Sequence, residues 1–187
     1  MLGDHLLGIY EKALDAGDDW YRRMDKVRDL GFDFLEISID ESEERLSRIY
    51  GSDPEIMDIE LMNCIRKHLS YEEKIGSPWY KVYPDVGNIA AWWLDPLSDL
   101  EAGIHSIVGV HLKDTLCRTS EKPGVFRDIP FGQGYVDFAA CLGKLEELGY
   151  TGPYMIEMWH KEGQDDRMLV REAKAFIEEQ YEKGVKR

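Results

Sequence analysis

The sequence predicts an α/β fold in which about six βα units form a parallel sheet covered by helices, as an incomplete barrel. Short apolar runs typical of strands alternate along the chain with segments that have helical periodicity, an order found in parallel sheets. A complete (β/α)₈ barrel has eight such units and typically about 250 residues. Since this chain has 187 residues, we expect it to lack two units.

The first two units occupy residues 6–48. A strand is expected at 6–10 and a helix at 18–30, where apolar residues recur close to the 3.6-residue period of an amphipathic helix. A second strand is expected at 32–39. Asp40 follows it in a position to cap the next helix.

The remaining units follow a break rich in glycine and proline at residues 51–54. Asp137 is placed to cap one of their helices, and a long loop at 115–136 precedes it. These units are expected as strand 55–58 with helix 60–74, strand 79–85 with helix 97–104, strand 107–114 with helix 137–148, and strand 153–159 with helix 165–183.

Composition limits the classes of protein to which the chain can belong. An apolar fraction of 43% with five tryptophans predicts one packed domain over residues 1–187. A formal net charge of -14 argues against nucleic-acid binding, which needs a basic face. A metal ion with a few nearby cations can still attract a small anionic substrate.

The cysteines and the apolar runs indicate in which cellular compartment we expect the protein. Three widely spaced cysteines, an odd number, predict reduced thiols in a cytoplasmic protein. The opening MLGDHLLGIYEKAL has no basic region followed by a long apolar core, so we expect no signal peptide. No run approaches the roughly 20 apolar residues of a membrane helix, so no membrane partner is expected.

Four of the apolar runs end in a residue type that binds metals: Glu55, Asp85, His111 and Glu157. The carboxyl ends of parallel strands meet at one edge of the sheet, where ligands and active sites gather. Three carboxylates and one imidazole form a hard donor set that suits Mn²⁺, Mg²⁺ or Co²⁺, with Zn²⁺ as a further alternative. An acid at a strand end can instead cap a helix or lie in a solvated loop.

Sequence motifs at these strand ends resemble a known enzyme family. The motifs are GIYEKAL, FLEISIDESEERL, YPDVGNIAAW, VHLKD, KPGVFRDIPFGQGYVDF and GPYMIEMW. They are similar to the L-ribulose-5-phosphate 3-epimerases, also called L-xylulose-5-phosphate 3-epimerases, of ascorbate and pentulose catabolism. That family belongs to the xylose isomerase-like superfamily, so the resemblance implies a TIM-barrel-like fold. It extends from Leu7 to about Lys174.

The chain departs from the family pattern in two places. Between Ile49 and Glu55 it passes from what resembles the helix after strand 2 directly to what resembles strand 5. The resemblance therefore implies a single domain with an internal deletion near 50–55, where strands 3 and 4 are missing. A short insertion, LCRTSE, follows the VHLKDT segment.

The resemblance also implies a metal site and a reaction. By position, the metal ligands are Glu55, Asp85, His111 and Glu157. The reaction is the metal-dependent inversion of C3 in a ketopentose 5-phosphate through an enediolate, whose charge the metal stabilises. Inversion needs a base on one face of the planar intermediate and an acid on the other. Glu55 and Glu157 are the candidates for these two roles, in an order that depends on the direction of reaction.

Weaker candidates for substrate binding lie near the histidine. Lys113 and Asp114 follow it and can orient substrate, or they can form a solvated ion pair. Gly132 and Gly134 lie in a loop with nearby cations that can meet a phosphate through backbone N–H groups, or simply turn toward the next helix. Glu36, Asp40 and Glu41, at the end of the second strand, are further candidates for contact with the substrate, and a helix cap explains Asp40 equally well.

Two other readings of function stay open. The chain can be a different sugar or sugar-phosphate isomerase or epimerase of the same superfamily. It can also be a catalytically impaired remnant that acts as a binding or assembly partner. Loss of two units from a closed barrel exposes strand edges and apolar surface, which favours a homo-oligomer.

Overall fold

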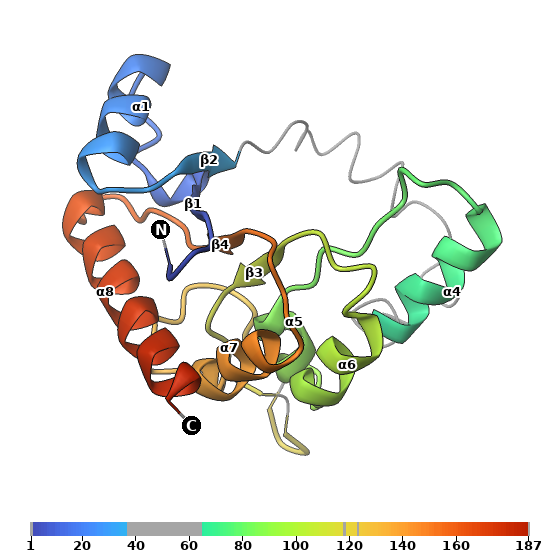
Figure 1. The fold of residues 1–187 in the computed structure, drawn as a ribbon. Helices are drawn as coiled ribbons and strands as arrows, with labels where there is room; N and C mark the ends of the chain where they lie inside the picture. Colours follow the sequence, from blue (N-terminus) through green and yellow to red (C-terminus); the bar gives the residue numbers. More distant parts are fainter. Residues whose placement is uncertain (1, 37–64, 118, 123, 187) are drawn as a thin grey trace.

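A computed structural model describes residues 2–36, 65–117, 119–122 and 124–186 (Figure 1). The helix expected after the second strand and the strand expected at 55–58 lie outside the described residues. Glu55, the first of the predicted metal ligands, therefore has no described position.

Four parallel strands form the centre of the described fold: β1 (Leu7–Tyr10), β2 (Phe34–Glu36), β3 (Val110–Leu112) and β4 (Tyr154–Ile156). Their order in the sheet is β2-β1-β4-β3. The first strand thus pairs with the last, with Ile9 opposite Ile156, as happens where a (β/α) barrel closes. The predicted parallel α/β class is confirmed.

The sheet continues beyond β3 through the segment that contains Asp85. Parallel bridges join Asp85 to His111 and Val82 to Ile107. The strand expected at 79–85 is thus reduced to isolated bridges. A short helix, α5 (Val86–Ala91), follows at once, although the sequence did not predict it. Its six residues, VGNIAA, are too few to show helical periodicity.

The other helices match the predicted alternation and pack around the strands. In Figure 1 they follow one another from α8 through α7 and α6 to α4, and α8 packs on α7, α7 on α6 and α6 on α4. A 3₁₀ turn, η1 (Glu11–Ala13), follows β1. The helices are α1 (Trp20–Asp29), α4 (Ile65–Ile75), α6 (Pro96–Gly103), α7 (Phe138–Glu147) and α8 (Asp166–Val185).

Aspartates determine where several of these helices begin. Asp19 accepts a hydrogen bond from the backbone of Arg22, and Asp165 accepts one from Met168. The predicted cap, Asp137, accepts one from Ala140 at 2.9 Å. Each carboxylate satisfies an N–H group of the first turn that has no partner within the helix.

The core lies between the strands and these helices. Leu7, Ile9, Leu112 and Ile156 are fully buried on the sheet, and Leu142 on α7 packs into the same cluster. Strands buried on both faces are typical of parallel sheets covered by helices. The structure contains, among its described residues, no helix long and apolar enough to cross a membrane.

Candidate active site

Three of the four predicted metal ligands meet at the carboxyl edge of the sheet. His111 lies in β3, Glu157 directly follows β4, and Asp85 bridges to His111 from the neighbouring segment. One ligand atom from each lies within 4.8 Å of the others, and all three side chains are largely buried. The parallel arrangement therefore gathers these three side chains into one cluster.

His111 uses both ring nitrogens to contact carboxylates. Its Nδ1 lies 2.6 Å from Oε2 of Glu157, and its Nε2 lies 3.2 Å from Oε2 of Glu36. Burial disfavours the imidazolium, but the hydrogen bonds to Glu157 and Glu36 outweigh it and raise the pKa of His111 to about 9. Burial also acts on Glu157, yet the hydrogen bond with His111 and the charge of Lys113 hold the pKa of Glu157 below its usual value.

Asp85 divides its two oxygens between a helix and the site. Its Oδ1 accepts hydrogen bonds from the backbone N–H groups of Gly87 at 2.8 Å and Asn88 at 3.1 Å, which caps α5. Its Oδ2 lies 2.6 Å from the Lys113 ammonium. Burial raises the pKa of Asp85, while Lys113 opposes that shift. One carboxylate can therefore cap a helix and still present an oxygen to a metal.

Asp114 lies next to the cluster but faces the loop at 115–136. Its Oδ2 accepts the N–H groups of Gly132 and Gly134, each at 2.9 Å, and its Oδ1 accepts that of Thr115 at 3.0 Å. A Cβ atom on Gly134 would lie 1.9 Å from Asp114 Oδ1, so only glycine allows this approach. In this structure the two glycine N–H groups bind Asp114, which holds the loop beside β3.

Two further residues complete the cluster. The Tyr83 hydroxyl donates to Glu36 Oε2 at 2.5 Å, and the Tyr83 ring meets His111 edge-on at 4.2 Å between centroids. Glu36 was predicted from the sequence only as a substrate contact, and Tyr83 was not among the predicted residues. The signal for Tyr83 was its position two residues before Asp85, which places both side chains on one face of an extended segment.

The contact between Glu36 and His111 shows that the sheet curls. Glu36 ends β2 and His111 lies in β3, and these strands are at opposite edges of the four-stranded sheet. In a flat sheet three strand spacings would separate them by roughly 14 Å. Their side chains nevertheless meet at 3.2 Å. The strands therefore curve around an interior, as in a barrel.

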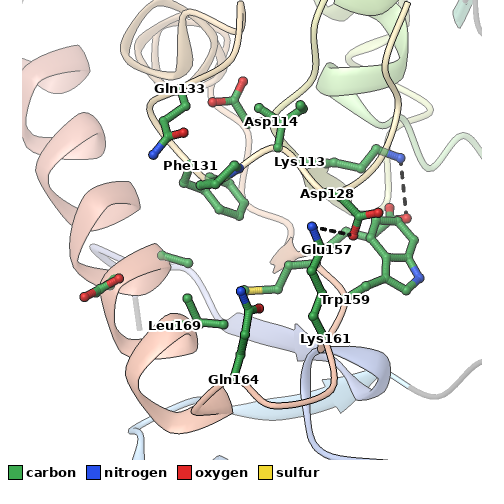
Figure 2. A pocket seen from close by; sticks show the side chains of 15 residues that line it. Lys113, Asp114, Asp128, Phe131, Gln133, Glu157, Trp159, Lys161, Gln164 and Leu169 are labelled. Atoms are coloured by element: carbon green, nitrogen blue, oxygen red, sulfur yellow. Dashed lines mark hydrogen bonds and ion pairs between the residues drawn. The ribbon is translucent and has the colours of Figure 1, made fainter.

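A cavity of about 210 Å³ opens beside Glu157 and Lys113. It lies between the loop at 128–133, the segment that leaves β4 and the start of α8 (Figure 2). Trp159 and Glu157 both line it, and Lys161 pairs with Asp128 at 3.6 Å, a contact drawn as a dashed line in Figure 2. Cavities for drug-sized ligands are about 300 to 1,000 Å³, so this one suits a smaller molecule.

The chain is similar to proteins of known family. The family model described as xylose isomerase-like TIM barrel matches residues 54–180. The L-ribulose-5-phosphate 3-epimerase UlaE of Escherichia coli O139:H28 is 32% identical over an alignment of 277 positions, gaps included, which covers 95% of this chain and 95% of the relative. The protein of the same name from Salmonella heidelberg is 32% identical, with 91% and 93% covered.

Solved structures agree on the fold. An L-ribulose 3-epimerase gives a TM-score of 0.70 at 15% identity, with 97% of this chain and 96% of that chain covered. A D-allulose 3-epimerase from Methylomonas sp., in complex with D-allulose, gives 0.69 at 13% identity, with 95% and 97% covered.

The alignment with the Escherichia coli relative also bears on the missing units. Its 277 positions exceed the 187 residues of this chain by 90. At least that many positions are therefore filled by the relative alone.

Proposed function

The chain belongs to the xylose isomerase-like TIM barrel family, and on that basis we propose that it interconverts L-ribulose 5-phosphate and L-xylulose 5-phosphate by epimerisation at C3. The relatives named as L-ribulose-5-phosphate 3-epimerases support this substrate. The observation that carries the proposal is the convergence of Asp85, His111 and Glu157 within 4.8 Å at the carboxyl edge of the sheet.

These three residues fit a divalent cation. They offer two carboxylates and an imidazole from a largely buried cluster, which is a donor set that Mn²⁺, Mg²⁺, Co²⁺ or Zn²⁺ accepts. Glu55 is the proposed fourth ligand, by its place in the sequence. When bound, the metal supplies positive charge that stabilises the negative charge developing on the substrate oxygens.

Glu157 and Glu55 are the proposed acid and base. Contacts with His111 and Lys113 favour the ionised form of Glu157, so it is ready to accept a proton from C3. Glu55 would then deliver a proton to the opposite face, or the two roles exchange in the reverse direction.

The substrate occupies the space beside Glu157 in this proposal. Lys113 faces that space directly, while Asp114 shapes its wall by holding Gly132 and Gly134 in place. Lys113 and Asp114 are the proposed direct contacts, and Gly132 and Gly134 belong to the proposed substrate-binding set through the loop that Asp114 holds.

The proposal is tested by purifying the full chain, measuring its metal content and following conversion of L-ribulose 5-phosphate to L-xylulose 5-phosphate. Bound metal together with turnover supports the enzyme. A folded, monodisperse protein that binds no metal and shows no turnover would favour the remnant that acts in binding or assembly.

The charge of the cavity favours a second candidate, epimerisation of an unphosphorylated ketose. Its lining contains two lysines and twice as many acids: Lys113, Lys161, Asp114, Asp128, Glu157 and Glu172. Such a lining attracts a phosphate weakly unless a metal adds positive charge. Parallel assays with L-ribulose and L-ribulose 5-phosphate at equal metal concentration separate the two candidates.

A further inference from the structure

A buried lysine lies between two of the residues that would hold the metal. The Lys113 ammonium is 2.6 Å from Asp85 Oδ2 and 3.4 Å from Glu157 Oε1, and its side chain is 7% exposed. We propose, on the basis of the proposed metal site, that Lys113 supplies the positive charge in that site before a metal binds. Its ammonium balances part of the negative charge of Asp85 and Glu157 when no metal is bound, and a divalent metal displaces it from Asp85.

The need for such a cation follows from the burial of the carboxylates. Asp85 and Glu157 have ligand atoms within 4.8 Å of each other in a poorly hydrated cluster. Two negative charges at that separation repel, and each has lost most of its hydration. The Lys113 ammonium offsets both costs, so the empty site can fold before metal arrives.

Displacement follows from the division of the Asp85 oxygens. Because Oδ1 accepts two N–H groups of α5, Oδ2 is the oxygen left for a metal. A divalent metal held by Oδ2 would compete for the oxygen that the Lys113 ammonium contacts at 2.6 Å. Two cations beside the same carboxylate oxygen repel each other, so metal binding would favour displacement of the ammonium.

The structure also offers a place for the displaced ammonium. Its Nζ lies 5.5 Å from the centre of the Trp159 ring, and both residues line the cavity beside Glu157 (Figure 2). The ammonium already lies over this ring, so a cation–π contact can continue to stabilise it when a metal takes its place at Asp85. Metal binding would thus leave the ammonium free to face the cavity, where acids outnumber lysines, and prepare it for an anionic substrate.

The test compares Lys113→Met with Lys144→Met in the full-length chain stripped of metal. Lys144 is a matched control, since it also lies between two carboxylates, those of Glu101 at 3.7 Å and Glu147 at 3.4 Å, outside the site. Mn²⁺ affinity is measured by calorimetric titration, and the melting temperature is measured with and without Mn²⁺.

We expect Lys113→Met to bind Mn²⁺ about tenfold more tightly than wild type, a change comparable to those seen around metal ligands. Its metal-free form should melt at a lower temperature. Lys113→Arg keeps the positive charge, so its affinity should remain near that of wild type, as should that of Lys144→Met. Lys113→Gln repeats the measurement if the methionine variant does not fold.

The outcomes separate this inference from the proposed function. Equal or weaker Mn²⁺ binding by Lys113→Met, with normal binding by wild type, overturns the inference alone. Mn²⁺ binding without turnover of L-ribulose 5-phosphate overturns the proposed function, and the affinity difference still decides the role of Lys113. A wild type that binds no Mn²⁺ overturns both.

Discussion

Glu157 is held at both of its carboxylate oxygens, Oε2 by His111 and Oε1 by Lys113. A carboxylate fixed in this way needs little reorganisation to accept a proton. We therefore expect Glu157→Gln to lower the rate of epimerisation by about 10²-fold to 10⁴-fold, the usual contribution of a general acid or base. Initial rates with saturating Mn²⁺ measure the effect.

A matched change gives the control for that variant. Glu179 is exposed and pairs with Lys183 at 2.6 Å on α8, away from the site, so Glu179→Gln should retain the wild-type rate. Glu55→Gln should behave like Glu157→Gln. Near-normal turnover in either site variant would contradict its role as acid or base.

Gly134 is a single residue on which the loop conformation depends. A Cβ there would come within 1.9 Å of Asp114 Oδ1 and 2.6 Å of the Thr115 carbonyl oxygen. Gly134→Ala should therefore push the loop from β3 and lower the free energy of unfolding by about 1 to 3 kcal/mol, as overpacking does. Urea unfolding measures this loss.

Gly17→Ala is the control, because its Cβ would meet only the Asp15 side chain at 3.3 Å. It should change the free energy of unfolding by less than about 0.5 kcal/mol. Equal stability of the two variants would show that the loop adjusts without cost.

The strand-end pattern predicted the cluster because the carboxyl ends of parallel strands lie at the same edge of the sheet. Side chains at these ends that point to the same face can therefore meet. Asp85, His111 and Glu157 follow this rule and meet. The contacts of Tyr83 and Glu36 depend on the curl of the sheet, which brings opposite edges together. No periodicity in a linear sequence encodes that distance, so these contacts could not be predicted.

Among the helices, α5 depends directly on a site residue. Asp85→Asn keeps an Oδ1 acceptor for the N–H groups of Gly87 and Asn88, whereas Asp85→Ala removes it. We expect both variants to weaken Mn²⁺ binding by at least about tenfold. Only the alanine variant should also lose the cap, at about 0.5 to 2 kcal/mol in unfolding free energy.

Asp95 provides the comparison, since it caps α6 through Leu97 and Ser98 without facing the metal cluster. Asp95→Ala should lower stability by a similar amount and leave Mn²⁺ affinity unchanged. If Asp85→Asn binds Mn²⁺ as wild type does, Oδ2 of Asp85 is not a ligand.

Helix boundaries were predictable where a cap and a periodic face coincide. The helix after Asp137 shows both, and α7 begins where the sequence indicated. The expected strand at 79–85 was not found at full length, because an extended apolar segment need not pair along its whole length. A hydrophobic pattern is a property of one segment of the sequence, whereas strand pairing also depends on the strand that lies next to that segment.

The chain as a whole joins its first and last units. β1 pairs with β4, and the Lys26 ammonium of α1 lies 2.5 Å from Asp166 at the start of α8. The sequence predicted two units fewer than a complete barrel, and the Escherichia coli relative fills at least 90 positions that this chain lacks. The location of the deletion near residues 50–55 stays a prediction. The expected homo-oligomer also stays a prediction, and light scattering can test it by measuring the molar mass in solution.

The contact between first and last units should make stability depend on acid pH. Burial raises the pKa of Asp166, but the hydrogen bonds from Lys26 and from the Asp15 backbone N–H outweigh it and hold that pKa below its usual value. A depressed folded pKa means that the carboxylate stabilises the fold fully above the unfolded pKa of about 3.9. This contribution is lost as pH falls through the folded value.

Urea unfolding of wild type and Asp166→Asn from pH 7 to pH 2 tests this dependence. The variant should be less stable at pH 7, and the difference should shrink below about pH 4 as the wild-type carboxylate takes up its proton. Asp25→Asn removes an exposed partner of Arg28 at 2.7 Å and should change the curve little. A constant gap between wild type and Asp166→Asn across the whole range would show that packing, and not the charge on Asp166, joins the first unit to the last helix.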